Sequence, residues 1–145
     1  MRLEAIERLE ASLKAKLPPE YGQFLSINNG GYSHQYSIRY KDANFGTEQQ
    51  ADIFHWLGIG IERKRDGYLG TEEAIQNMGG LLNFDYIPIA VDASGAPILI
   101  SMRRDDYGKV VFFDQEAPDT KSLSELGKTF SSFLSKLELT RRRDL

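Results

Sequence analysis

The sequence contains no cysteine, and only two of its 145 residues are histidines. Without cysteine, the protein cannot form disulfides, thiolate zinc sites, iron–sulfur clusters or a cysteine nucleophile. The two histidines, His34 and His55, lie 21 residues apart, and neither occurs in the His-x-x-x-His or Glu-x-x-His spacing of metal-binding helices. We therefore expect no bound metal ion and no cofactor.

Long apolar runs are missing as well. No segment approaches the roughly 18 uncharged apolar residues that a membrane-spanning helix needs. The charges among the first eight residues interrupt any secretory signal. We therefore expect a soluble protein that has no membrane partner, and the cytoplasm is its default compartment.

Basic residues are scarce outside the C-terminus. The chain has 18 Lys and Arg and 21 Asp and Glu, and without residues 140–145 the net charge falls from −3 to −5. Residues 42–62 and 66–92 contain four and five acids respectively, and neither segment contains a Lys or Arg. This charge repels phosphate backbones and argues against nucleic-acid binding. Such runs are usually only a solvated surface, and the alternative is an acidic face for a basic partner.

The overall composition is that of one globular domain. Apolar residues make up 41% and charged residues 27% of the chain, and a chain of this length buries roughly 70% of its unfolded surface. No internal repeat, low-complexity tract or Pro/Gly/Ser-rich linker divides it. We expect a single domain over residues 1–139, followed by a short basic C-terminal tail at residues 140–145.

Apolar spacing predicts helices at both ends of the chain and strands between them. Leu3, Ile6, Leu9 and Leu13 recur at helical spacing. Pro18-Pro19 ends this helix and opens a second one, which Asn29-Gly30-Gly31 stops. Two further helices are predicted at residues 71–78 and 125–137. Short alternating or apolar runs predict strands at residues 36–40, 53–57, 86–91, 97–102 and 109–113.

This order of elements indicates an α+β domain, in which a mixed, mostly antiparallel sheet is flanked by helices. Asp92-Ala93-Ser94-Gly95 predicts a tight turn between two of the strands. The predicted core residues are Leu17, Tyr21, Phe24, Leu25, Ile87, Ile89, Val111, Phe130, Phe133 and Leu134.

No catalytic motif is present. The sequence lacks the Gly-x-Ser-x-Gly nucleophile elbow and the Gly-x-x-x-x-Gly-Lys phosphate loop. The paired acids Glu72/Glu73 and Asp105/Asp106 are adjacent, so their side chains diverge on a helix or a strand and cannot form a general acid/base pair by themselves. We therefore do not expect an enzyme.

Several segments resemble a known family. Residues 17–25, Leu-Pro-Pro-Glu-Tyr-Gly-Gln-Phe-Leu, followed by Asn-Gly-Gly at 29–31, resemble the signature Leu-Pro-x-x-Tyr-x-x-Phe-Leu…Asn-Gly-Gly of the SUKH superfamily. This group includes the fungal cell-wall assembly regulators and many bacterial immunity proteins. Residues 87–95, 110–114 and 129–134 resemble its central strand and turn, its later strand and its closing helix, in family order. The resemblance implies the SUKH fold over nearly the whole chain.

The resemblance also implies a function. Bacterial members bind and neutralise a toxin, often a nuclease, that a competing cell delivers, and they have no catalytic machinery. Nuclease domains are basic because they hold phosphates, so an acidic inhibitor would associate faster. The alternative is a housekeeping protein-interaction module related to the cell-wall assembly regulators, and a hydrolase that uses Asp92 or Asp114 is third. The sequence leaves the toxin's identity and the oligomeric state open.

The middle of the chain matches the family only loosely and combines acids with tyrosines, which are common in interfaces. We expect the partner face there, at residues 32–73, joined by residues 105–107. The predicted contact residues are Tyr32, His34, Asp42, Asp52, Asp66, Tyr68, Glu72, Glu73, Asp105, Asp106 and Tyr107.

Overall fold

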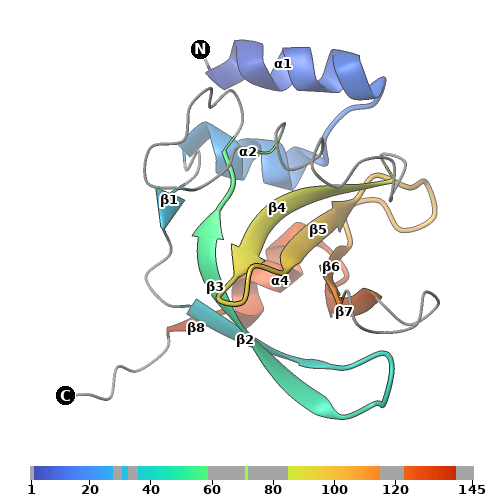
Figure 1. Cartoon of the computed structure of the whole chain (residues 1–145). Helices are drawn as coiled ribbons and strands as arrows, with labels where there is room; N and C mark the ends of the chain where they lie inside the picture. The colour runs from blue at the N-terminus through green and yellow to red at the C-terminus, as the bar shows by residue number, and fades with distance from the viewer. Residues whose placement is uncertain are drawn as a thin grey trace.

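The computed structural model has helices near both ends of the chain and a sheet between them (Figure 1). The structure describes residues 2–27, 31–32, 36–58, 71, 85–114 and 123–139. The helices are α1 (Arg2–Leu13), α2 (Pro19–Ile27) and α4 (Phe130–Lys136). The strands are β1 (Gly31–Tyr32), β2 (Tyr36–Lys41), β3 (Glu48–Trp56), β4 (Tyr86–Asp92), β5 (Pro97–Ser101), β6 (Val110–Phe113), β7 (Leu123–Gly127) and β8 (Glu138–Leu139).

The strands form one sheet in the order β7-β6-β5-β4-β3-β2-β8, and β1 pairs with β3 beside this path. Every pairing between described strands is antiparallel. Consecutive strands from β2 to β7 are therefore neighbours in the sheet. The predicted α+β class and its mostly antiparallel sheet are confirmed.

Strand β3 is long, and its two halves pair with different strands. Its first half pairs with β2, from Ser37↔Asp52 to Lys41↔Glu48. Its second half pairs with β4 and β1, and the register with β4 shifts between Ile53 and His55. Since β4 pairs with β3 only from Ile53 onward, the outer half of the β2–β3 hairpin extends past the end of β4 (Figure 1).

The sheet curls, so that β2 contacts β7 although four strands separate them along the sheet. The rings of Tyr40 on β2 and Phe112 on β6 lie 5.5 Å apart. At the tip of the hairpin, the amide of Ala43 donates a 2.9 Å hydrogen bond to the hydroxyl of Ser124 on β7. These contacts fix the position of the hairpin relative to the far side of the sheet.

Aromatic side chains join α2, β3 and α4 into one core. Phe24 of α2 packs against Trp56 of β3 and Phe130 of α4, and both centroid distances are 5.1 Å. Tyr21 meets Phe130 edge-on at 5.3 Å, and Trp56 meets Phe133 at 6.2 Å. Such tilted and edge-to-face pairs each add about 0.5–1.5 kcal/mol beyond the area they bury. We call these five residues the aromatic cluster.

The predicted core is confirmed. Eight of its ten residues are buried, and the other two, Phe24 and Leu134, are partly buried and pack against the same core. Parts of the family signature thus meet in space, because Tyr21 and Phe24 of α2 contact Phe130 of α4.

One predicted element is wrong in its first part. The helix predicted at residues 125–137 begins only at Phe130, and residues 123–127 form strand β7. Ser124 and Leu126 are buried and Glu125 between them is exposed, which is the alternation of a strand. The hydroxyl of Thr129 accepts a 3.0 Å hydrogen bond from the Ser132 amide and caps α4. This cap and the pairing of β7 with β6 outweigh the helical spacing of the apolar residues.

The other predictions fare as follows. The first two helices and the existence of the predicted strands are confirmed, although β3 begins at Glu48, five residues before the predicted start. The turn after β4 is confirmed as well, because Gly95 has a φ of 91° and the Ser94 amide donates to Asp92. The helix predicted at 71–78 lies outside the described residues except for Thr71, as does the stop at Asn29-Gly30. The division into residues 1–139 and a tail at 140–145 stays a prediction.

Candidate functional site

The predicted contact residues that the structure describes with their side chains fall in two places. Asp105, Asp106 and Tyr107 lie in the turn between β5 and β6, and Asp42 and Asp52 belong to the β2–β3 hairpin. Figure 1 shows the hairpin at the bottom of the molecule and the β5–β6 turn higher up, toward α2. The two groups are anchored to different parts of the fold.

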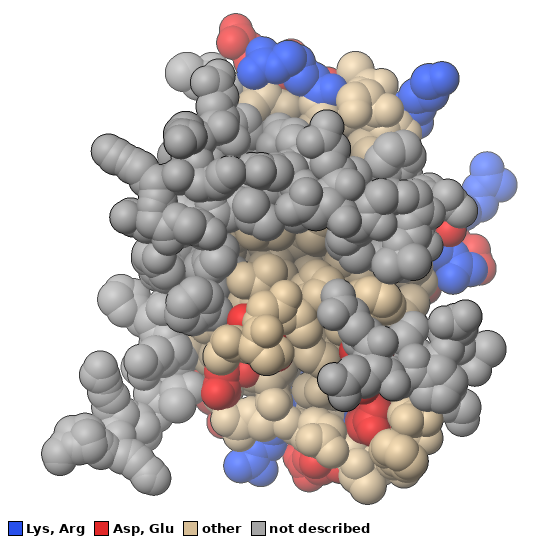
Figure 2. All heavy atoms as spheres, viewed as in Figure 1, with Lys and Arg blue, Asp and Glu red and all other residues tan. Residues whose placement is uncertain are grey.

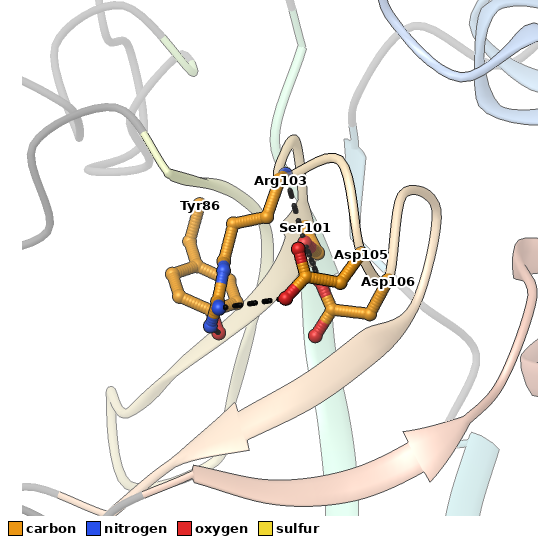
Figure 3. A network of polar contacts seen from close by, with 5 residues as sticks. All are labelled: Tyr86, Ser101, Arg103, Asp105 and Asp106. Atoms are coloured by element: carbon orange, nitrogen blue, oxygen red, sulfur yellow. Dashed lines mark hydrogen bonds and ion pairs between the residues drawn. The ribbon is translucent and has the colours of Figure 1, made fainter.

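In the β5–β6 turn, the buried hydroxyl of Ser101 organises the backbone (Figure 3). It donates a 2.5 Å hydrogen bond to the Asp106 carboxylate and accepts a 3.0 Å bond from the Arg103 amide. One oxygen of Asp106 is therefore used inside the turn. This arrangement makes Asp106 a structural residue at least as much as a surface acid.

The Arg103 side chain lies across this turn. Its guanidinium donates to the Tyr86 hydroxyl and to the Asp105 carboxylate, each at 3.3 Å (Figure 3). The bond to Tyr86 raises the pKa of Arg103, and the charges of Asp106 and Asp105 act in the same direction. Both side chains of this ion pair are open to solvent, which screens their attraction. Asp105 is thus a surface acid whose charge Arg103 partly balances.

Tyr107 connects the turn to the corner between α1 and α2. Its hydroxyl donates to the carbonyl oxygen of Lys16. Burial, and secondarily the charge of Glu10, raise the pKa of Tyr107. The next residue, Gly108, has a φ of 90°, and a Cβ built there would lie 3.8 Å from the Pro18 Cβ. Tyr107 therefore helps to hold the turn against the Pro18 corner.

In the hairpin, the two predicted acids differ. Asp42 is only 9% exposed, and its carboxylate accepts the amides of Asn44 at 3.1 Å and Phe45 at 3.3 Å. Asp52 is exposed and accepts the side-chain amide of Gln50 at 3.1 Å. Asp42 thus holds the turn together, whereas Asp52 presents its charge to solvent.

The remaining predicted contact residues cannot be placed as side chains. The backbone of Tyr32 lies in β1 opposite His55, but its side chain is outside the described part of the structure. The others, His34, Asp66, Tyr68, Glu72 and Glu73, lie outside the described residues.

The sequence pointed to Asp42, Asp92 and Asp114 separately, but it did not place them together around Tyr40. Burial raises the pKa of Tyr40 above its usual value, and the nearby carboxylate of Asp42 adds to this effect. Asp114 and Asp92 act in the same direction. A usable signal was present, because each of the three acids ends or directly follows a strand, and these strands alternate in the meander.

Sequence reasoning also missed Phe45, whose side chain is 77% exposed at the tip of the hairpin. The signal here was the segment Asp42-Ala43-Asn44-Phe45-Gly46 between two alternating runs. Asp, Asn and Gly are ordinary turn residues, whereas a large aromatic residue in the turn has no local role. Its exposed ring is therefore available for contact with another molecule.

Within the described ranges, no group of three or more His, Cys, Asp or Glu side chains could hold a metal ion. A surface hollow of about 470 Å³ lies beside the C-terminal half of α1, but charged side chains line much of it, including Glu7, Glu10 and Lys16. Glu10 is itself bonded to the Leu17 amide at 2.8 Å.

Of the helices that the structure describes, none has the length and apolar character needed to cross a membrane.

Comparison with known proteins identifies the family. No curated protein matches the chain. The model of the SMI1 / KNR4 family (SUKH-1) matches residues 2–136, which is nearly the whole length. The matched range contains the Pro18 corner, the aromatic cluster and the antiparallel sheet described above. The chain therefore belongs to the SMI1/KNR4 family, SUKH-1.

Proposed function

We propose that this chain is an intracellular immunity protein that binds and neutralises a cognate toxin of an interbacterial competition system. The observation that carries the proposal is family membership over residues 2–136, since the SUKH group includes many bacterial immunity proteins. The proposed action is binding by protein–protein contact, without catalysis by the chain itself.

The charge of the chain supports a basic toxin, such as a nuclease. The net charge of −3 becomes more negative when the basic C-terminus is left aside. Complementary charge accelerates encounter, with rates that reach about 10⁸–10⁹ M⁻¹s⁻¹ at low salt. Neutralisation requires the inhibitor to arrive before the toxin acts, so fast association suits the role.

The test starts from the genes that neighbour the gene of this chain, and the chain is co-expressed with any of their products that is toxic to cells. We expect cells that produce the toxin to survive when they also produce this chain, and to die when they produce a non-cognate family member at the same level. The purified chain should form a stable complex with the toxin inactivated at its catalytic residue. Death of cells that contain ample soluble chain, together with no complex, would refute the proposal.

The same experiment distinguishes the immunity role from the housekeeping alternative. An interaction module related to the cell-wall assembly regulators would give no protection against any toxin, and its deletion would alter growth without competitors. An immunity protein should show the opposite pattern, with a deletion phenotype only when toxin-producing cells are present.

A further inference from the structure

We propose that the tip of the β2–β3 hairpin, residues 42–47, is a docking surface for a basic protein, with Phe45 as its apolar anchor. This inference rests on the proposed function in one respect, because it takes the cognate toxin as the basic protein. The surface itself is argued from exposure, backbone geometry and charge.

Phe45 is the starting point. At 77% exposure it is one of few large apolar side chains on the described surface that remain open to solvent, together with Ile27, Tyr36 and Tyr107. Tyr107 is already bonded to Lys16, and Tyr36 lies at the start of β2. Aromatic residues, phenylalanine among them, are enriched in protein–protein interfaces relative to the rest of the surface.

The backbone that carries Phe45 is fixed from within the turn. Asp42 and Thr47 are joined by a 2.8 Å backbone hydrogen bond, and the Gly46 amide donates to the Asp42 carbonyl at 2.7 Å. The Asp42 carboxylate holds the amides of Asn44 and Phe45. Gly46 has a φ of 71°, which glycine adopts without strain.

The turn is also fixed from outside. Ser124 of β7 is 1% exposed, and its hydroxyl accepts the Ala43 amide at 2.9 Å. The hairpin tip is thus attached to the opposite end of the curled sheet. An anchor on a preorganised backbone loses little conformational freedom on binding, and this raises affinity.

Charge indicates the nature of the partner. Because adjacent strands are antiparallel, β2, β4 and β6 run in the same direction, and Asp42, Asp92 and Asp114 stand at their C-terminal ends. All three act on Tyr40, so these strand ends gather near the base of the tip. Glu48, directly after the tip, is exposed, but it lies cross-strand from the exposed Lys41 and shares its face, so the acidic character comes from the three aspartates.

The basic residues of β2 do not cancel this charge on the same side. Side chains alternate along a strand, so Arg39 and Lys41 lie on the face opposite to Tyr40. In Figure 2, most of the acidic atoms of the visible face lie in its lower half, where Figure 1 places the hairpin, whereas most of the Lys and Arg atoms lie at the upper and right margins. The hairpin tip therefore complements a basic surface.

The test compares two exposed apolar residues at different places. Ile27, at the end of α2, is 76% exposed and provides a matched control for Phe45. Binding to the catalytically inactivated cognate toxin is measured by surface plasmon resonance. We expect Phe45→Ala to raise Kd by about 30-fold or more, mainly through faster dissociation, as truncation of an anchor residue does. Ile27→Ala should change Kd by less than about 2-fold.

A second pair tests the charge. Glu48→Lys and Glu7→Lys change the net charge equally, but Glu48 adjoins the tip and Glu7 lies on α1, at the other end of the molecule in Figure 1. We expect Glu48→Lys to slow association several-fold and to weaken its salt dependence. Equal slowing by both variants would show that only net charge matters and would overturn the placement.

The outcomes separate this inference from the proposed function. Tight binding that Phe45→Ala leaves unchanged, with the fold intact, overturns the docking surface and leaves the immunity role standing. No binding by the unaltered chain overturns the immunity role and the occupant named here. A Phe45-dependent dimer of the chain, seen by analytical ultracentrifugation, overturns the inference in favour of a second copy as the occupant.

Discussion

The aromatic cluster and the hairpin tip use the same residue type in opposite ways. Phe130 of the cluster is 1% exposed and contacts three other aromatic rings, whereas Phe45 at the tip is 77% exposed. The cluster joins α2, β3 and α4 and so holds these three elements together in the core. The tip is held by Asp42, Gly46 and Ser124 and does not need Phe45. Burial therefore marks the cluster as part of the structural core, and exposure leaves Phe45 available to the partner proposed above.

The largest difference should appear when the two phenylalanines are truncated. We expect Phe130→Ala to lower the free energy of unfolding by about 3–5 kcal/mol, because it opens a cavity among packed rings. Phe45→Ala should change it by less than about 0.5 kcal/mol, as exposed substitutions usually do. Urea denaturation followed by Trp56 fluorescence measures both. Similar losses for the two variants would mean that Phe45 packs in the fold after all.

Two glycines, one packed tightly and one with open space around it, test how closely the elements of the core are packed. A Cβ on Gly127 would lie 2.6 Å from the amide nitrogen of Phe133, whereas a Cβ on Gly22, inside α2, would have no neighbour within 4 Å. We expect Gly127→Ala to cost about 1–3 kcal/mol, as overpacking does. Gly22→Ala should instead stabilise the chain by up to about 1 kcal/mol, because alanine favours the helix. The measurement is the midpoint temperature of thermal unfolding of each variant. A shift of both midpoints in the same direction would refute the packing of β7 against α4.

At the tip, the residue that matters for stability should be Asp42. Its loss leaves the amides of Asn44 and Phe45 without their carboxylate acceptor, and we expect Asp42→Ala to cost about 1–2 kcal/mol. Hydrogen exchange of these two amides should accelerate as well. Asp52→Ala is the matched control, because Asp52 is exposed, and it should cost less than about 0.5 kcal/mol. Equal costs would place Asp42 among ordinary surface acids.

The smallest effect concerns pH. Burial and the acids near Tyr40 raise its pKa above 10.0, so an unfolded tyrosine loses its proton before Tyr40 does. The resulting contribution to stability is complete below the unfolded pKa and is lost as pH rises through the folded pKa. The difference in ultraviolet absorbance between the wild type and Tyr40→Phe isolates this titration. Asp114→Asn should shift it to lower pH, and an unchanged titration would contradict the proximity of the two groups.

The fold was largely predictable from the sequence because its signals are local. Pro18-Pro19 marks the corner between α1 and α2, and Asp92 with Gly95 marks a turn that the hydrogen bonds confirm. The start of α4 was not predictable in this way. Leu126 fits the helical spacing of the residues after it, and only pairing with β6 and the Thr129 cap place it in β7.

The candidate site was less predictable, because the sequence gives the charge of a side chain but not the groups to which it hydrogen-bonds. Asp42 and Asp106 were expected as surface acids, but each is engaged by its own turn. Asp92 and Asp114 lie 22 residues apart, and only the register of the meander brings them both to Tyr40. Phe45 was not predicted, because it belongs to no helical or alternating pattern of apolar residues. An aromatic residue between Asp42 and Gly46 in a turn is nevertheless unusual enough to be noticed in the sequence.

Hydrogen–deuterium exchange of the chain, free and bound to its catalytically inactivated toxin, tests the division of roles most directly. The aromatic cluster should exchange slowly in both states, whereas amides of residues 42–50 should become markedly slower in the complex. Peptides from α1 and the end of α2 should not change. Protection confined to residues 105–107 or to α1, with residues 42–50 unaffected, would contradict the assignment of the hairpin tip as the partner surface.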